Sequence, residues 1–135
     1  MKQSLPHIVR IAIVPCASLA PNILEKYLAG MPIAVFPLPT DIEHYGNATC
    51  EAEQEYANGN YSEKTVLQFS STEEIRQFPS PAFVITDAQG DSFLIGTKEP
   101  PYPMLEITET IDADTNIKTY KVTFTRQKSL VPCAV

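Results

Sequence analysis

The residues able to carry out chemistry in this chain are few and lie far apart. Two histidines, His7 and His44, and three cysteines, Cys16, Cys50 and Cys133, are the candidates for nucleophilic or acid–base work. A cysteine becomes a nucleophile beside an imidazole, and the two partners need not be close in sequence. Cys16 and Cys50 lie in apolar or strand-like segments, where burial keeps a thiol protonated and inert. We therefore predict no catalytic residue, and an enzyme that uses Cys16 or His44 stays open as an alternative.

Metal binding has one weak candidate. Asp41, Glu43 and His44 offer two carboxylates and an imidazole on a polar stretch, a combination that suits a divalent metal. Adjacent residues on an unstructured loop are more often solvated than ligating. Asp112-x-Asp114-x-Asn116 resembles the start of a calcium loop, but it lacks that loop's glycine and its final glutamate. The cysteines have no CxxC spacing and no glycine-rich phosphate loop is present, so we predict neither a metal nor a cofactor.

Length and composition limit the classes of protein that remain. The chain has 135 residues, which corresponds to a single domain, residues 1–135. It carries 10 basic and 16 acidic side chains, a net charge of −6, and such a balance argues against a nucleic-acid partner. Twelve prolines disfavour a helical bundle and favour short strands with stiff connections. No apolar run approaches the length of a membrane-spanning helix, so we expect no membrane partner.

The amino-terminal segment has two interpretations. Lys2 and Arg10 precede an apolar stretch, Ile11 to Ala20, which imitates a short signal peptide. Pro15 within that stretch, Arg10 at its start and a proline just after its end argue against secretion. We instead expect a buried strand over residues 7–14 and a cytoplasmic protein.

The clearest structural signal is a hairpin centred on Asn58-Gly59. Residues 48–57 and 60–69 have strand character, and Asn-Gly tolerates the positive φ angles that a two-residue turn requires. The same register places Glu51, Glu53 and Glu55 on one face. It predicts three cross-strand pairs, which are Ala57 with Asn60, Tyr56 with Tyr61, and Glu53 with Lys64.

The remaining segments complete an antiparallel pattern. Alternating apolar residues and turn residues predict two further hairpins, short helical pieces and isolated strands. The expected elements are helical turns over 22–29, a strand over 33–38, a helix over 72–78, hairpins over 82–97 and 105–124, and a last strand over 130–135. We predict a mainly β protein, an antiparallel barrel or sandwich of about eight short strands in up-and-down hairpins, with one or two short helices.

Charge is distributed unevenly along the chain. The interval between Lys26 and Lys64 holds acidic residues and no basic one, whereas no acid follows Asp114. The acidic and basic hairpins are either neighbours in one molecule or complementary surfaces between molecules. Pro100 to Pro103 form a stiff, partly apolar loop that is a plausible contact element. The candidate interface residues are Glu51, Glu53, Glu55, Pro100, Pro101, Tyr102, Lys118, Lys121 and Arg126.

Three stretches carry a resemblance to a known group of proteins. They are residues 50–59 with the strand ending Leu67-Gln68-Phe69, residues 92–103, and residues 119–125 with Leu130-Val131-Pro132-Cys133. Together they resemble small proteins encoded among phage or prophage structural genes of gut anaerobes, near tail and head–tail connector genes. The resemblance implies a non-enzymatic, β-rich subunit that assembles with copies of itself and with phage-type structural proteins, as a tail-completion or connector component.

A second function remains open. A small β-barrel could bind a ligand in a cavity lined by phenylalanines, although such residues are more often plain core. The phenylalanines in question are Phe69, Phe83, Phe93 and Phe124.

Overall fold

A computed structural model describes residues 2–4, 7–19, 21–31, 33, 40–72, 80–98, 102–109, 117–126 and 129–133. This part of the chain is mainly β, as the sequence predicts. It contains a 3-10 turn η1 (Cys16–Ser18), one short helix α1 (Ile23–Leu28), and ten strands: β1 (Lys2–Ser4), β2 (Ile8–Pro15), β3 (Thr40–Ile42), β4 (Tyr45–Ala57), β5 (Asn60–Ser71), β6 (Pro81–Asp87), β7 (Ser92–Ile95), β8 (Met104–Glu109), β9 (Lys118–Arg126) and β10 (Val131–Cys133).

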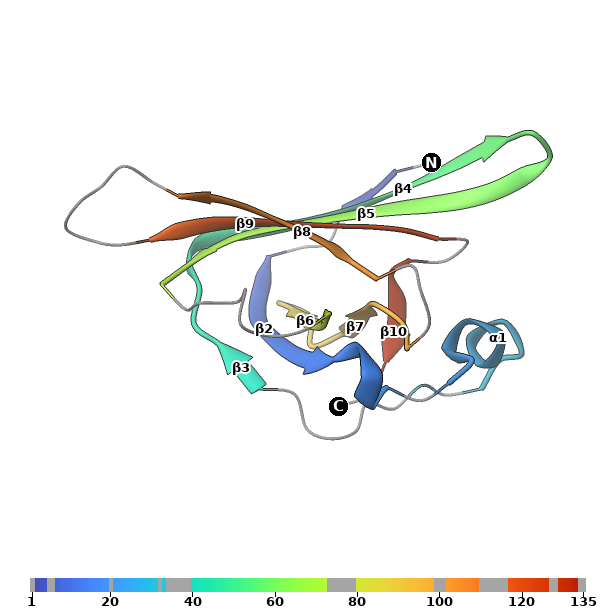
Figure 1. The fold of residues 1–135 in the computed structure, drawn as a ribbon, viewed down its shortest axis with the longest axis horizontal. Helices are drawn as coiled ribbons and strands as arrows, with labels where there is room; N and C mark the ends of the chain where they lie inside the picture. Colours follow the sequence, from blue (N-terminus) through green and yellow to red (C-terminus); the bar gives the residue numbers. More distant parts are fainter. Residues whose placement is uncertain are drawn as a thin grey trace.

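The strands form two antiparallel sheets that lie one above the other (Figure 1). The first sheet has the order β1-β4-β5-β9-β8, and the second has the order β10-β7-β6-β2-β3. Each sheet, in the described part of the chain, keeps two edge strands and does not close on itself. The fold is therefore a sandwich, and of the two predicted architectures the barrel is excluded.

The order of the strands differs from the up-and-down order that we expected. The chain alternates between sheets in pairs: β2 and β3 lie in the second sheet, β4 and β5 in the first, β6 and β7 in the second, and β8 and β9 in the first. Each antiparallel pair has an apolar face that it cannot cover by itself. Placing successive pairs on opposite layers buries these faces against each other, and local sequence patterns do not encode that choice.

The hairpin formed by β4 and β5 follows the predicted register. Ala57 pairs with Asn60, Tyr56 with Tyr61, and Glu53 with Lys64. Asn58 and Gly59 have φ angles of 54° and 79°, the left-handed values that the two-residue turn demands. The turn chemistry therefore fixes which side chains of both strands share a face.

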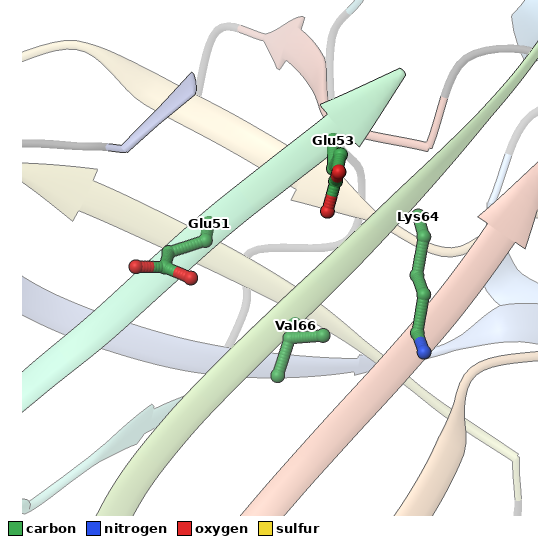
Figure 2. A pocket seen from close by; sticks show the side chains of 4 residues that line it. All are labelled: Glu51, Glu53, Lys64 and Val66. Atoms are coloured by element: carbon green, nitrogen blue, oxygen red, sulfur yellow. The ribbon is translucent and has the colours of Figure 1, made fainter. Parts of the chain in front are cut away.

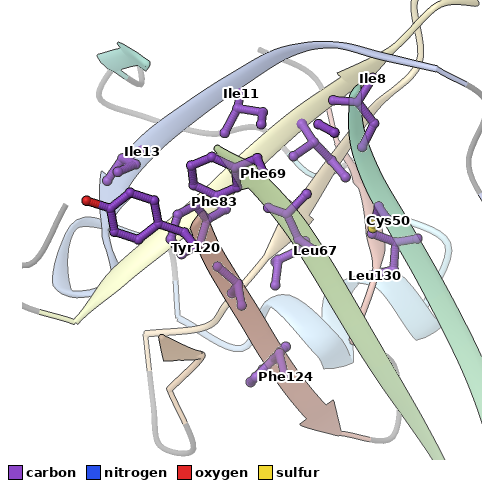
Figure 3. Close-up of a cluster of buried hydrophobic side chains, with 14 of the residues drawn as sticks. Ile8, Ile11, Ile13, Cys50, Leu67, Phe69, Phe83, Tyr120, Phe124 and Leu130 are labelled. Atoms are coloured by element: carbon purple, nitrogen blue, oxygen red, sulfur yellow. The ribbon is translucent and has the colours of Figure 1, made fainter. Parts of the chain in front are cut away.

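The main core lies between the two sheets (Figure 3). Phe69 of β5 and Tyr120 of β9 are opposite each other in register, and their stacked rings have centroids 5.4 Å apart. Phe83 of the second sheet lies with its ring centroid 6.3 Å from that of Phe69. Phe124 belongs to the same cluster and Phe93 packs against it. The phenylalanines proposed to line a ligand cavity are thus part of the packed core.

A second apolar cluster covers the far side of the second sheet. Its buried members include Val14 of β2, Val84 of β6 and Leu94 of β7, together with Ile23 of α1. The helix lies within the predicted segment 22–29 and ends before Gly30, whose φ of 78° suits a helix terminus. The chain between β2 and β3 thus closes one face of the second sheet, while the outer face of the first sheet has no such cover among the described residues.

Some expected elements cannot be compared with the structure. The strand over 33–38, the helix over 72–78 and residues 112–116, the turn of the hairpin expected over 105–124, lie wholly or mostly outside the described residues. The last strand, predicted over 130–135, is present as β10 (Val131–Cys133) in the described residues.

Candidate interaction surface

The end of the β4–β5 hairpin extends past the second sheet (Figure 1). Cys50 and Ala52 point to the core and are buried, whereas Gln54 and Tyr56, the next residues on the same face, are exposed. Glu53 and Glu55 on the opposite face are exposed as well. Residues 53–61, called the hairpin tip below, therefore present both faces to solvent, and beyond Glu53, which is still paired with Lys2 of β1, they form a two-stranded ribbon.

Tyr56 and Tyr61 form the apolar feature of the hairpin tip. Their ring centroids are 4.6 Å apart with an interplanar angle of 50°, and the residues remain 64% and 67% exposed. Because the turn makes Ala57 and Asn60 the hydrogen-bonded pair, Tyr56 and Tyr61 form the next, non-hydrogen-bonded pair, in which side chains approach most closely. Such a ring contact stabilises by about 0.5–1.5 kcal/mol beyond area burial, so the two rings hold each other in place while both stay accessible.

The outer face of the first sheet carries the predicted row of glutamates. Glu51, Glu53 and Glu55 are all exposed on that face, as the register predicts. Glu51 and Glu53 line a shallow depression of about 120 Å³ together with Lys64 and Val66 of β5 (Figure 2). Since Lys64 lies opposite Glu53, the depression mixes charges of both signs. Such a depression is a poor trap for a cation.

The basic residues of β9 have acidic neighbours inside their own sheet. Lys118 lies opposite Glu109, Lys121 opposite Glu106, and Arg126 opposite Glu63. The acidic β4–β5 hairpin and the basic β8–β9 hairpin are neighbours in one sheet, joined through β5 and β9, and Glu63 with Arg126 is the pair that links them. A contact of these surfaces with another molecule stays a prediction.

Exposure separates these basic residues. Lys121 is exposed, Lys118 is half-buried, and Arg126 is half-buried with its Nη1 donating a 2.9 Å hydrogen bond to Thr97 Oγ1. The Arg126 side chain is therefore already engaged in a hydrogen bond within the molecule. Lys121 is the member of the basic set best placed on the surface.

The proline-rich loop is described only at its end. Pro100 and Pro101 lie outside the described residues, Tyr102 is 42% exposed, and Pro103 is buried. Tyr102 is therefore accessible, and its role as a contact residue stays a prediction.

The proposed metal ligands and histidines are not brought together. Asp41 lies on β3, not on a loop, and its Oδ1 accepts a 2.6 Å hydrogen bond from Arg10 Nε of β2. His44 is half-buried, and His7 is exposed just before β2. Within the described ranges, no group of three or more histidine, cysteine, aspartate or glutamate side chains is arranged to hold a metal ion.

The pKa values of all three thiols are raised, which lowers their reactivity at neutral pH. Burial is the main cause in each case and raises the pKa of Cys16 to about 11, of Cys50 to about 12 and of Cys133 to about 11. A hydrogen bond with the Thr97 backbone opposes the pKa rise at Cys16, whereas the charges of Glu51 and Glu63 add to it at Cys50. Thiols of this kind are protonated at neutral pH and behave as small apolar groups.

Residues 13–17 (IVPCA) and 130–134 (LVPCA) have nearly the same sequence, but the fold does not bring Cys16 and Cys133 together. Cys133 is level with Ser92, Thr86 and Arg10 across the second sheet, whereas Cys16 follows Pro15 at the other end of β2. Arg10 and Pro15 are separated by about 16 Å of strand at about 3.3 Å per residue. A disulfide needs Cα atoms within about 7 Å, so these cysteines cannot form one in this fold.

The raised thiol pKa values predict a specific alkaline behaviour. Unfolded thiols ionise near 9.0, whereas the folded ones retain their protons to about 11 or 12. The unfolded state thus releases protons first, and the free energy of unfolding is expected to fall as the pH rises from about 9. Below about pH 9 the thiols are protonated in both states, so they add no pH dependence to the free energy of unfolding. Urea unfolding at a series of pH values measures the fall, and a variant with all three cysteines changed to alanine provides the control. If the thiols reacted with iodoacetamide at pH 7 as fast as free cysteine, these pKa assignments would be wrong.

A buried polar cluster beneath the hairpin was not singled out from the sequence. Glu63 is 2% exposed, and its Oε1 accepts hydrogen bonds from Ser129 N at 3.0 Å, Leu130 N at 2.9 Å and Ser129 Oγ at 3.3 Å. Thr65 Oγ1 lies 2.5 Å from Ser129 Oγ. The predicted register already placed Glu63 on the inward face with Thr65 and Leu67, and that was the available signal. The cluster ties the segment between β9 and β10 to β5, so it belongs to the framework that supports the hairpin.

Comparison with protein-family models, curated proteins and solved structures finds no significant match. The functional interpretation therefore depends on the residues and geometry described above. No helix in the described ranges combines the length and the apolar character needed to cross a bilayer.

Proposed function

We propose that this chain is a non-enzymatic assembly protein that docks through its β4–β5 hairpin, as a tail-completion or head–tail connector component of a phage-like particle. The single observation that carries the proposal is the Tyr56–Tyr61 pair, which lies 64% and 67% exposed at the end of a hairpin that extends beyond the second sheet. The phage-type partner comes from the resemblance of residues 50–59 with 67–69, residues 92–103, and residues 119–125 with 130–133 to proteins encoded in phage structural gene clusters.

The exposure of two tyrosines at the hairpin tip supports a role in binding. Tyrosine is enriched at the energetic centres of protein interfaces, because its ring buries a large area at a small cost in side-chain entropy. The mutual contact of the rings restricts both side chains before any partner arrives, which lowers the entropic cost of docking. A solvent-exposed hairpin end needs neither aromatic residue for its turn, since Asn58 and Gly59 supply the turn geometry.

The alternatives draw less support from the same residues. A cysteine-dependent enzyme would need a thiolate, and burial raises the pKa of every thiol to about 11 or 12. A ligand-binding role would need space among the phenylalanines, whereas Phe69, Phe83 and Phe124 are members of one packed cluster. An assembly role needs only the surfaces that the chain presents.

Co-expression with the structural proteins encoded by neighbouring genes tests the proposal. We expect at least one of them to co-purify with the wild-type chain. The variant Tyr56→Thr/Tyr61→Thr should bind that partner with an affinity at least about 30-fold lower. Threonine retains the preference for a strand, so the hairpin should remain folded.

The matched control is Met104→Thr, which changes a residue that is 61% exposed on β8, the far edge of the first sheet. This variant should bind as the wild type does. A chain that stays monomeric with every neighbouring gene product, at every concentration, would overturn the proposal.

A further inference from the structure

We infer that the hairpin tip is received by a cleft whose one wall is cationic, rich in arginine, and whose other wall is apolar. The inference depends on the proposed docking function and names the chemistry of the partner. It follows from three features of the tip: its two exposed faces, the different side chains on them, and its charge.

The two faces of the hairpin tip carry different chemistry. Successive residues of a strand point to opposite faces, so Glu53 and Glu55 lie on the outer face, while Tyr56 and Tyr61 lie on the inner one. All four residues are exposed. A flat partner surface would contact only one of these faces, whereas a cleft that receives the hairpin end-on contacts both.

Charge decides which occupant the outer face prefers. Residues 51–63 contain four glutamates and no lysine or arginine. Glu53 has Lys64 of β5 and Lys2 of β1 opposite it in register, whereas Glu55, nearer the turn, lies opposite Ser62. Of these glutamates, Glu63 is buried and the others are exposed. Two copies of the tip would bring like charges together, which disfavours a second tip as the occupant. A partner with a cationic wall is favoured instead.

Arginine fits this tip better than lysine does. Its planar guanidinium can pair with a carboxylate through two parallel hydrogen bonds, and it also stacks on aromatic faces. The carboxylates of Glu53 and Glu55 on the outer face offer the planar pairing, whereas the rings of Tyr56 and Tyr61 lie on the inner face, against the apolar wall. A lysine ammonium gains the charge attraction but not the planar pairing.

A titration with short basic peptides tests this chemistry without the natural partner. The isotope-labelled protein is titrated with deca-arginine and with deca-lysine at low salt, and amide shifts are followed by NMR. We expect the largest shifts at residues 53–61 and binding of deca-arginine about 3- to 10-fold tighter than that of deca-lysine. Shifts spread evenly over all acidic surfaces, or equal binding of the two peptides, would overturn the inference.

A pair of charge variants separates the tip from the net charge. Glu53→Gln/Glu55→Gln removes two charges at the tip, and Glu25→Gln/Asp91→Asn removes two exposed charges from α1 and the β6–β7 turn. The tip variant should lose about 10-fold in deca-arginine affinity, and the control less than about 2-fold. Equal losses in both variants would also overturn the inference.

The same variants distinguish this inference from the proposed function. If a co-purified complex is weakened by Tyr56→Thr/Tyr61→Thr but not by Glu53→Gln/Glu55→Gln, the docking function stands and the cationic cleft is wrong. If deca-arginine binds the tip as expected but no structural protein co-purifies, the chemistry of the tip stands and the assembly role is wrong.

Discussion

Replacing Gly96 by alanine is expected to lower the free energy of unfolding by about 3–4 kcal/mol, because backbone strain and steric overlap add at this position. Gly96 follows β7 and has a φ of 134°, a conformation that residues with a side chain rarely adopt. A Cβ atom placed there would lie 2.8 Å from Ala82 Cβ, 3.2 Å from Ala82 Cα and 3.3 Å from Pro103 Cγ. Ala82 Cα is backbone within β6, so it cannot rotate away as a flexible side chain would. Urea denaturation of the purified variant measures the change.

Gly90→Ala is the matched control for the conformational part of this effect. Gly90 also has a positive φ, 89°, but a Cβ atom added there meets nothing within 4 Å. Its cost is expected to be about 1–2 kcal/mol, from the backbone alone. In the background Ala82→Gly, which removes the closest atom, Gly96→Ala should cost less than it does in the wild type. A Gly96→Ala variant no less stable than Gly90→Ala would show that β6 and β7 are not packed as closely as described.

Gly96 illustrates which parts of this fold a sequence can and cannot predict. The Asn58-Gly59 turn was predictable because its two residues and its register are local, and the pairs Tyr56–Tyr61 and Glu53–Lys64 followed from it. The need for glycine at Gly96 comes from Ala82 and Pro103, which lie on other segments. Nothing near position 96 in the sequence encodes that contact.

The order of the strands also depends on contacts between segments that are far apart in the sequence. The hairpins formed by β6 with β7 and by β8 with β9 were predicted from alternation and turn residues. The pairing of β5 with β9, and of β1 with β4, joins segments that are far apart in the chain. Those choices follow from the burial of each hairpin's apolar face, which depends on the whole sandwich. The expected up-and-down order was wrong for that reason.

The candidate surface was predicted in part. Alternation correctly placed Glu51, Glu53 and Glu55 on one exposed face. The same alternation places Gln54 and Tyr56 on the core side with Cys50 and Ala52, yet only the latter two are buried. The strands of the hairpin are longer than the sheet beneath them, and strand length relative to a partner layer is a tertiary property. The exposed tyrosines, which carry the proposed function, could therefore be recognised only in the structure.

The second large effect is expected at Glu63. Glu63→Ala should lower the free energy of unfolding by about 4 kcal/mol, because it leaves the buried amides of Ser129 and Leu130 without the acceptor that both now share. Each unsatisfied buried amide costs about 1–3 kcal/mol, and the Ser129 hydroxyl also loses its bond to Oε1. Hydrogen exchange should report the loss first at Leu130 and along β10, since this segment leads directly into the edge strand.

Glu63→Gln separates the hydrogen bonds from the charge. The amide oxygen of glutamine can accept from the same two backbone groups, so the loss should be about half of that in Glu63→Ala or less, with bonds to a neutral acceptor being weaker than those to a carboxylate. Ser129→Ala leaves both amides paired but removes the hydroxyl that contacts Glu63 Oε1 and the buried Thr65 Oγ1, and it should cost about 1–2 kcal/mol. Because β10 has only three residues and pairs only with β7 in the described part of the chain, it depends on this anchor more than any longer strand would. Equal stability of the Glu63→Ala and Glu63→Gln variants would mean that the side-chain oxygen of residue 63 does not hold the crossover, and that β10 is retained by its pairing with β7 and by the apolar contacts of Leu130 and Val131.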